Sequence, residues 1–155
     1  MKPVRNAVKC ILIEKDKIVI TKYLKGIKKG YYDIPGGKIE EGETSESAAI
    51  REMKEETGIE VSNLTKKGIF EVEYPDRRFI FEVFIAKKYQ GNPQNFEENT
   101  SEWIDINELL TKEKILSNIL LLKNPYKEFL YNENTNFKIK VEVDEGENIL
   151  KIELE

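Results

Sequence analysis

The stretch that decides the fold of this chain is residues 37–59, "GKIEEGETSESAAIREMKEETGI". Its second part, residues 44–57, contains no glycine or proline, which predicts a helix. Thr44 or Ser45 is a suitable N-cap, and Gly58 stands where a glycine commonly ends a helix. The sequence therefore predicts one helix over residues 44–57, preceded by a glycine-containing loop.

Three glutamates of this helix, Glu52, Glu55 and Glu56, fall on one face if each residue advances by about 100°. Like charges three or four residues apart destabilise a helix by roughly 0.2–0.5 kcal/mol per pair. A solvated acidic face would tolerate this cost, whereas a bound divalent cation would turn the repelling carboxylates into ligands. The core is expected on a separate face, formed by Ala49, Ile50 and Met53.

The composition restricts the chemistry that such a site can carry. The chain has no histidine, which excludes a histidine-dependent triad and the usual imidazole metal site. The single cysteine, Cys10, excludes an intrachain disulfide, and its apolar surroundings predict a buried, inert thiol. Acid–base or metal chemistry therefore falls to carboxylates, which prefer hard cations such as magnesium, manganese or calcium.

Length and charge indicate the broad class of protein. A chain of 155 residues with 39% hydrophobic and 35% charged residues fits one ordinary soluble domain. The first residues contain no long apolar run, so we expect neither a secretory signal nor a membrane span, and a cytoplasmic location. Residues 131–155 carry the net charge of −4 and residues 1–130 are neutral. The chain thus lacks the basic face that binding to a nucleic-acid polymer requires.

Outside the quoted stretch, β-rich segments alternate with loops rich in glycine, proline and polar residues. The expected strands are residues 4–14 and 17–25, which would form a hairpin, and then residues 64–75, 77–89 and 103–106. Helical segments are expected at residues 107–110 and from about residue 112.

The end of the chain has a pattern of its own. Apolar residues alternate along two segments, which predicts a β-hairpin with one buried face: Phe137, Ile139, Val141 and Val143, then Leu150, Ile152 and Leu154. Because an isolated hairpin is only marginally stable, it must pack on something. We expect residues 1–130 to form the main domain and residues 131–155 a hairpin extension packed on it. A dimer contact or a flap over the site are the alternatives.

Nine positions of the quoted stretch follow the order glycine, five residues, glutamate, seven residues, then Arg-Glu-apolar-any-Glu-Glu-any-Gly-apolar. They are Gly37, Glu43, Arg51, Glu52, Met53, Glu55, Glu56, Gly58 and Ile59. At every defined position the stretch resembles the Nudix box of the Nudix hydrolases. With the preceding "YYDIPGG" and the order of strands and loops, the resemblance covers about residues 4–125 and leaves the terminal hairpin outside. It implies an α/β fold, an α/β/α sandwich with a mixed sheet between helices.

The resemblance also implies hydrolysis of a nucleoside diphosphate linked to another moiety, with water as the nucleophile and Mg²⁺, or Mn²⁺ as a substitute, as the cofactor. The metal-binding groups would be the carbonyl of Gly37 and the carboxylates of Glu52, Glu55 and Glu56. Arg51 would orient these glutamates through charge-assisted hydrogen bonds. Glu43 would support the loop or reach the metal through water. The general base stays open between Glu52 and Glu97, because MutT-type members carry an acid on this later loop.

The resemblance is greatest to MutT-type enzymes, which convert nucleoside triphosphates, including oxidised ones such as 8-oxo-dGTP, to the monophosphate and pyrophosphate. An ADP-ribose or nucleotide-sugar diphosphatase is an alternative, suggested by Pro75 sixteen residues after the box. A non-catalytic nucleotide sensor is an alternative of another class. Tyr31 and Tyr32 are expected to contact the nucleotide, and Lys38 its phosphates. Phe70, Phe81 and Trp103 are further stacking candidates, and a homodimer is left open.

Overall fold

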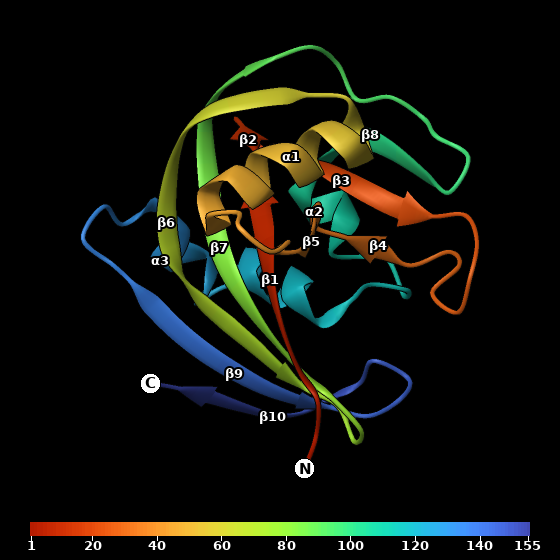
Figure 1. The fold of residues 1–155 in the computed structure, drawn as a ribbon, viewed down its shortest axis with the longest axis vertical. Coiled ribbons are helices and arrows are strands. Elements are labelled where there is room, and N and C mark those ends of the chain that lie inside the picture. Colours follow the sequence, from red (N-terminus) through yellow and green to blue (C-terminus); the bar gives the residue numbers. More distant parts are fainter.

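Two β-sheets form the centre of the computed structural model, which describes residues 1–155 (Figure 1). The larger sheet is mixed and has the strand order β10-β9-β6-β7-β1-β5, with β1 parallel to β7 and β6 parallel to β9. Its strands are β1 (Val4–Ile11), β5 (Gly36–Lys38), β6 (Glu60–Glu73), β7 (Arg78–Gln90), β9 (Phe137–Val143) and β10 (Ile149–Leu154). The smaller sheet contains β2 (Ile13–Glu14), β3 (Lys17–Tyr23), β4 (Tyr32–Asp33) and β8 (Asn99–Asp105).

The predicted hairpin of residues 4–14 and 17–25 forms only in part. The first segment breaks at Leu12, and only β2 pairs with β3. Its longer part, β1, enters the other sheet, where it pairs with β7 from Val4↔Arg78 to Ile11↔Ile85. The prediction was wrong because local turn signals identify a hairpin, whereas the stronger partner of β1 lies about seventy residues later in the chain.

Helices cover both faces of the larger sheet, which confirms the predicted α/β/α sandwich (Figure 1). Helix α1 (Ser45–Thr57) packs on one face, and α2 (Ile106–Leu109), the 3₁₀ helix η1 (Ser117–Leu122) and α3 (Lys127–Tyr131) lie on the other side. The predicted ends of α1 are confirmed. The Thr44 hydroxyl accepts a hydrogen bond from the Ser47 amide, and Gly58 ends the helix with φ of 81°.

The helical segment expected from residue 112 begins later. The backbone of residues 114–116 pairs with Tyr32, whose amide donates to the Lys114 carbonyl and whose carbonyl accepts from the Leu116 amide. This pairing uses groups that a helix would need, so the helix starts only at η1 and is of the 3₁₀ type. Every residue of η1 is buried, so no polar face marked it in the sequence.

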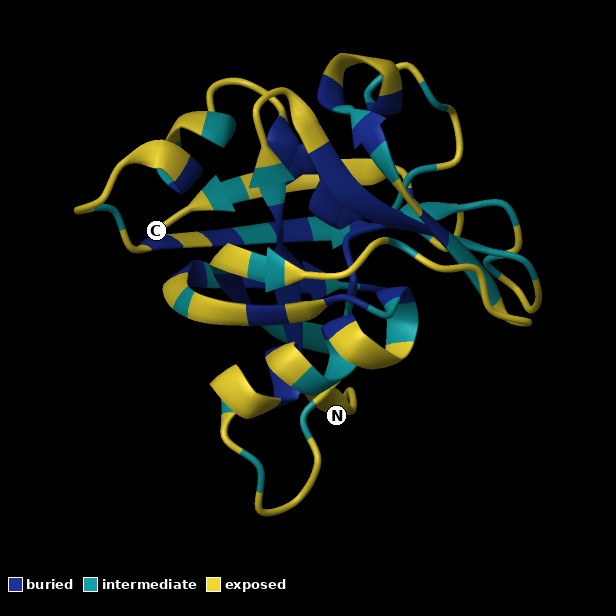
Figure 2. Ribbon diagram, turned by 90° about the horizontal axis from the view of Figure 1, so that it is seen from above, coloured by how far each residue is buried: buried dark blue, intermediate teal, exposed yellow.

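The core lies on both sides of the larger sheet, as the buried band between exposed outer surfaces shows (Figure 2). Beneath α1, Cys10 is fully buried as predicted, and burial raises the pKa of its thiol to about 12, which disfavours the reactive thiolate. The buried side of α1 differs from the expected one, since Ala48 is buried and Ile50 is 36% exposed. This shift turns the face that carries Glu52 and Glu56 partly inward, so these acids border the core instead of standing apart from it.

The terminal hairpin extends the larger sheet, because β9 pairs with β6 from Gly68↔Phe137 to Glu73↔Glu142. The predicted alternation holds for β9, whose apolar side chains are buried. It fails for β10, where Leu150 is 66% and Leu154 57% exposed. Strand β10 forms the edge of the sheet, and no helix covers its apolar side chains.

Candidate active site

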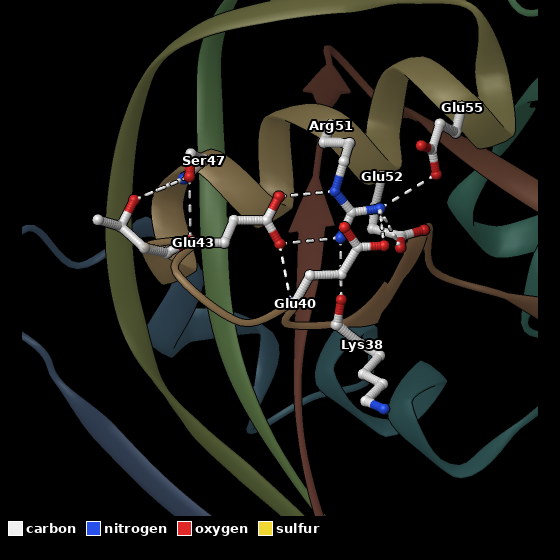
Figure 3. Close-up of polar contacts among 8 residues, drawn as sticks. Lys38, Glu40, Glu43, Ser47, Arg51, Glu52 and Glu55 are labelled. Atoms are coloured by element: carbon white, nitrogen blue, oxygen red, sulfur yellow. Dashed lines mark hydrogen bonds and ion pairs between the residues drawn. The ribbon is translucent and has the colours of Figure 1, made fainter.

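Arg51, in the middle of α1, connects the charged groups of the site (Figure 3). Its Nε and Nη2 donate to the two carboxylate oxygens of Glu43 at 2.6 and 3.0 Å. Its Nη1 donates to Glu52 at 2.8 Å and to Glu55 at 3.1 Å, and Nη2 also donates to the Lys38 carbonyl at 3.0 Å. One guanidinium thus ties the loop before the helix to two helical glutamates.

The bidentate pair between Arg51 and Glu43 is a charged clamp. The Arg51 hydrogen bonds lower the pKa of the Glu43 carboxyl to about 2, and the same pair raises the pKa of Arg51. Glu43 also accepts a hydrogen bond from the Glu40 amide at 2.9 Å. The clamp therefore stays ionised over the whole neutral range and fixes the loop between β5 and α1.

Two glutamates approach the backbone of β5. A Cβ atom added to Gly37 would lie 2.5 Å from the carboxyl carbon of Glu52, so any larger residue there would displace this carboxylate from its place against the backbone. The Gly36 amide donates to Glu56 Oε1 at 2.9 Å. Glu55 instead faces solvent, with 59% of its side chain exposed. Glu52 and Glu56 therefore form the inner part of the acidic face.

Burial changes the titration of both inner acids. It raises the pKa of Glu52, against the effect of Arg51, and it raises the pKa of Glu56 to about 8, against the effect of Lys9. Both carboxylates therefore lie where a negative charge is costly unless more positive charge is brought close.

A cleft of about 390 Å³ opens beside the acids, a volume within the usual range of small-molecule sites. Gly37 and Lys38 from β5 line it, and so do the aromatic side chains of Tyr74, Phe79 and Phe81. The rings of Phe79 and Phe81 are stacked with centroids 5.5 Å apart. A larger cavity of about 650 Å³ elsewhere in the molecule includes no residue of the quoted stretch, so the smaller cleft is the candidate site.

Comparison with known proteins agrees with this geometry. The family model of the NUDIX domain matches residues 3–123, most of the chain. The chain is a MutT-type member of the Nudix hydrolase family. The 8-oxo-dGTP diphosphatase of Escherichia coli (strain K12) is 34% identical over 107 residues, which cover 68% of this chain and 83% of that protein.

Two further similarities bear on the extent of the match. The uncharacterized Nudix hydrolase YvcI of Bacillus subtilis (strain 168) is 35% identical over 106 residues, which cover 64% of this chain and 65% of YvcI, just under two thirds of its length. The crystal structure of a MutT protein from Bacillus halodurans has a TM-score of 0.77, with 23% identity and 97% of each chain covered. This structural likeness supports the fold over nearly the whole chain, the terminal hairpin included.

The Nudix acids suit a hard divalent cation by the chemistry of their oxygens and by their close approach to a glycine backbone. No three carboxylates of the chain already converge as a metal cage. Arg51 occupies the space between the acids, since its Nη1 bonds both Glu52 and Glu55. Glu52 and Glu56, with Glu55 from the same face, would hold the cation once these pairs loosen.

Other predicted site residues of the Nudix domain lie apart from this group. The carboxylate of Glu97 is 84% exposed and pairs with Lys25 at 2.7 Å. Tyr31 lines a different cavity, and Tyr32 packs against the core. Lys38 does line the cleft, and so does Phe81.

The two remaining stacking candidates do not reach the cleft. Phe70 is fully buried, and Trp103 packs against Tyr89 with ring centroids 5.4 Å apart. Both aromatic side chains therefore pack in or against the core.

No helix of the structure has the length and apolar character needed to cross a bilayer.

A buried polar network in the wall of the cleft was not predicted from the sequence. Lys9 is 4% and Asp33 3% exposed, and the Lys9 ammonium donates to Asp33 Oδ1 at 2.9 Å, Asp33 Oδ2 at 3.0 Å and the Ile34 carbonyl at 2.9 Å. Asn118 and Tyr23 also donate to the Asp33 carboxylate, at 2.7 and 2.6 Å. The one available signal was the lysine inside the apolar segment "AVKCIL". The other members of the network, Asp33 with Ile34, Tyr23 and Asn118, come from three segments that local patterns do not connect to Lys9.

Proposed function

We propose that this protein is a Mg²⁺-dependent hydrolase that converts a nucleoside triphosphate to the monophosphate and pyrophosphate. The observation that carries the proposal is the cleft itself, whose lining combines the box glycine with aromatic rings. Acids that hold a cation belong beside the phosphates, and aromatic rings belong beside a base. The volume of about 390 Å³ lies in the usual range of small-molecule sites, and a nucleotide would lie with its phosphates at the acids and its base at the rings.

A divalent ion, when bound, would neutralise phosphate oxygens and lower the pKa of the attacking water. Glu52, Glu55 and Glu56 would supply its carboxylate ligands, with the Gly37 carbonyl. Arg51 would keep its bidentate pair with Glu43 and orient the acids from there, while its bonds to Glu52 and Glu55 give way to the cation. Mn²⁺ would substitute for Mg²⁺, because both favour oxygen ligands.

Of the residues that line the cleft, Phe79 and Phe81 would contact the base, and Lys38 would contact the phosphates. The similarity to an 8-oxo-dGTP diphosphatase supports an oxidised purine nucleotide as the substrate. Tyr31 and Tyr32, which the sequence predicted to contact the nucleotide, are weaker candidates for this contact because neither lines the cleft.

For the general base we propose Glu52 in preference to Glu97. Glu52 lies against Gly37 in a half-buried position with a raised pKa, whereas Glu97 is exposed and paired with Lys25. A positioned general base contributes roughly 10²–10⁴-fold to the rate. We expect Glu52→Gln to lower kcat by about this factor and Glu97→Gln to lower it less than about tenfold. The opposite order would assign the base to Glu97.

A substrate panel with and without Mg²⁺ tests the proposed function. It should include 8-oxo-dGTP, the common nucleoside triphosphates, ADP-ribose and nucleotide sugars, with products separated by chromatography. We expect a monophosphate and pyrophosphate from a triphosphate. Sugar phosphate as a product would favour the alternative diphosphatase, and tight nucleotide binding without turnover would favour the sensor.

We further propose that the chain forms a homodimer through the free edge of β10. Antiparallel pairing of two β10 strands centred on Ile152 would place Lys151 opposite Glu153 of the other copy and Leu150 opposite Leu154. The pairing would cover apolar side chains that are 37–66% exposed in one copy and satisfy an edge that is otherwise prone to aggregation.

Light scattering after size-exclusion chromatography tests the dimer. The wild-type chain should have twice the chain mass at micromolar concentration, and Ile152→Lys should be a monomer because it places two like charges opposite each other. The control is Ile27→Lys, at an isoleucine that is 97% exposed outside β10. A wild-type monomer, or a dimer that survives Ile152→Lys, would contradict the arrangement.

A further inference from the structure

Glu147, in the turn between β9 and β10, is the one acid of this turn that is buried. Its residue exposure is 7%, and its side chain is 2% exposed. The neighbouring Glu145 is exposed. Burial of a carboxylate is costly unless it is paired and hydrogen-bonded, so Glu147 requires a specific reason to point inward.

The partners of Glu147 come from two distant segments. Lys28, from the loop after β3, donates to Glu147 Oε2 at 2.6 Å, and the Tyr74 hydroxyl, after β6, donates to Oε1 at 2.9 Å. Figure 1 shows the β9–β10 turn beside the β6–β7 turn that carries Tyr74. Each carboxylate oxygen thus joins the hairpin to a different part of the Nudix domain.

The turn holds Glu147 in an uncommon backbone conformation. Its φ is 67°, a left-handed value that is unfavourable for a residue with a side chain. Asp144 secures the turn, because its Oδ1 accepts hydrogen bonds from the amides of Gly146 at 3.0 Å and Asn148 at 2.9 Å. The sequence therefore keeps a glutamate where glycine or asparagine would be less strained.

Both partners of Glu147 line the candidate cleft. Tyr74 packs edge-on against Phe79 with centroids 6.0 Å apart, and the Arg77 guanidinium lies 4.0 Å from the Tyr74 ring centroid. The Lys28 ammonium lies 6.0 Å from the same centroid. Glu147 thus fixes Tyr74 and Lys28 beside the aromatic side chains of the cleft.

We propose that Glu147 is a positioning residue that holds Tyr74 and Lys28 beside the aromatic rings of the cleft, so that the terminal hairpin takes part in selecting the substrate base. The proposal rests on the proposed function, which places the base against these rings. A two-ring base extends farther along the aromatic wall than a one-ring base. Loss of Glu147 should therefore weaken the binding of purine nucleotides more than the binding of pyrimidine nucleotides.

Steady-state kinetics with two single variants, their double variant and one control variant tests the proposal. Glu147→Gln removes the charge that holds Lys28, and Tyr74→Phe removes the hydroxyl but keeps the ring. A hydrogen bond to a charged group contributes enough for roughly a tenfold change. We expect KM for a purine triphosphate to rise about tenfold in each variant, with kcat changed less than about threefold and with no additive loss in the double variant. Glu145→Gln, in the same turn, is the matched control and should behave as the wild type.

Two further readouts separate positioning from a purely structural role. Calorimetric affinity for a purine monophosphate without metal should fall in parallel with the rise of KM, and labelling of Lys28 by an amine reagent should become faster. A lower melting temperature with unchanged KM and unchanged nucleotide affinity would overturn the proposal. If the wild-type chain turns over no nucleotide, the proposed function fails. In that case the affinity for the purine monophosphate alone tests the positioning role of Glu147. If the wild type and Glu147→Gln bind the monophosphate equally tightly, the positioning role is rejected as well.

Discussion

At the scale of single residues, Gly37 is the position where backbone geometry and chemistry are most closely linked. The methyl group of an alanine at this position would lie 2.5 Å from the carboxyl carbon of Glu52. Because Gly37 has no left-handed backbone angle, alanine would act through this contact and not through backbone strain. We expect Gly37→Ala to fold and to lose activity by about 10–100-fold, as for disturbed metal surroundings. Circular dichroism and kcat check this, and full activity would show that Glu52 has no fixed place.

The raised pKa of Glu56 predicts a pH dependence of the metal-free protein. Its ordinary value of 4.5 is raised to about 8 on folding, because burial disfavours the charge. The folded state therefore holds the proton more tightly, and this contribution to stability is complete below about pH 4.5 and is lost as the pH rises through about 8. Thermal unfolding in a chelator should show the wild type losing stability over this window relative to Glu56→Gln. A pH-independent difference between the two would refute the shift.

At the scale of elements, α1 depends on a cap that is visible in the sequence. The Thr44 hydroxyl accepts from the Ser47 amide at 3.1 Å and is itself exposed. Loss of an N-cap costs about 1 kcal/mol, which corresponds to roughly 2–4 °C in melting temperature for a chain of this size. Calorimetry of Thr44→Ala should show this decrease, whereas Thr44→Ser should show little change. Equal melting temperatures for all three proteins would mean that the cap does not stabilise the helix.

The same element shows what the sequence can predict. Both ends of α1 were predicted because Thr44 and Gly58 act through neighbouring backbone groups. The sheet to which β1 belongs was not predicted, since its partner β7 lies far along the chain. The site divides in the same way. The order of the box acids was visible in the sequence, but the partial burial of Glu56 depends on how α1 is rotated on the sheet.

Long-range contacts also account for what the sequence missed in the cleft. Asp33 and Asn118 lie 85 residues apart and meet in a buried network. Glu147 is an ordinary acid in a polar turn until the fold brings it to Tyr74. Neither pair has a local pattern, so only the assembled sheets reveal them.

At the scale of the whole molecule, metal binding should stabilise the fold. A ligand that binds only the folded state at 100 times its Kd adds about 2.7 kcal/mol, or roughly 5–10 °C in melting temperature. We expect Mg²⁺ or Mn²⁺ to raise the melting temperature, and Glu56→Gln to remove most of this increase. Lys54→Gln, a change on the exposed surface of the same helix, is the control. An equal increase in Glu56→Gln would place the metal elsewhere.

The most direct test of the account is the hydrolysis of 8-oxo-dGTP by the wild type and by Glu52→Gln, in Mg²⁺ and in a chelator. We expect monophosphate and pyrophosphate in equal amounts from the wild type with Mg²⁺, no product in the chelator, and a rate for Glu52→Gln lower by about 10²–10⁴-fold. Release of single phosphates, turnover in the chelator or an undiminished rate for Glu52→Gln would contradict it.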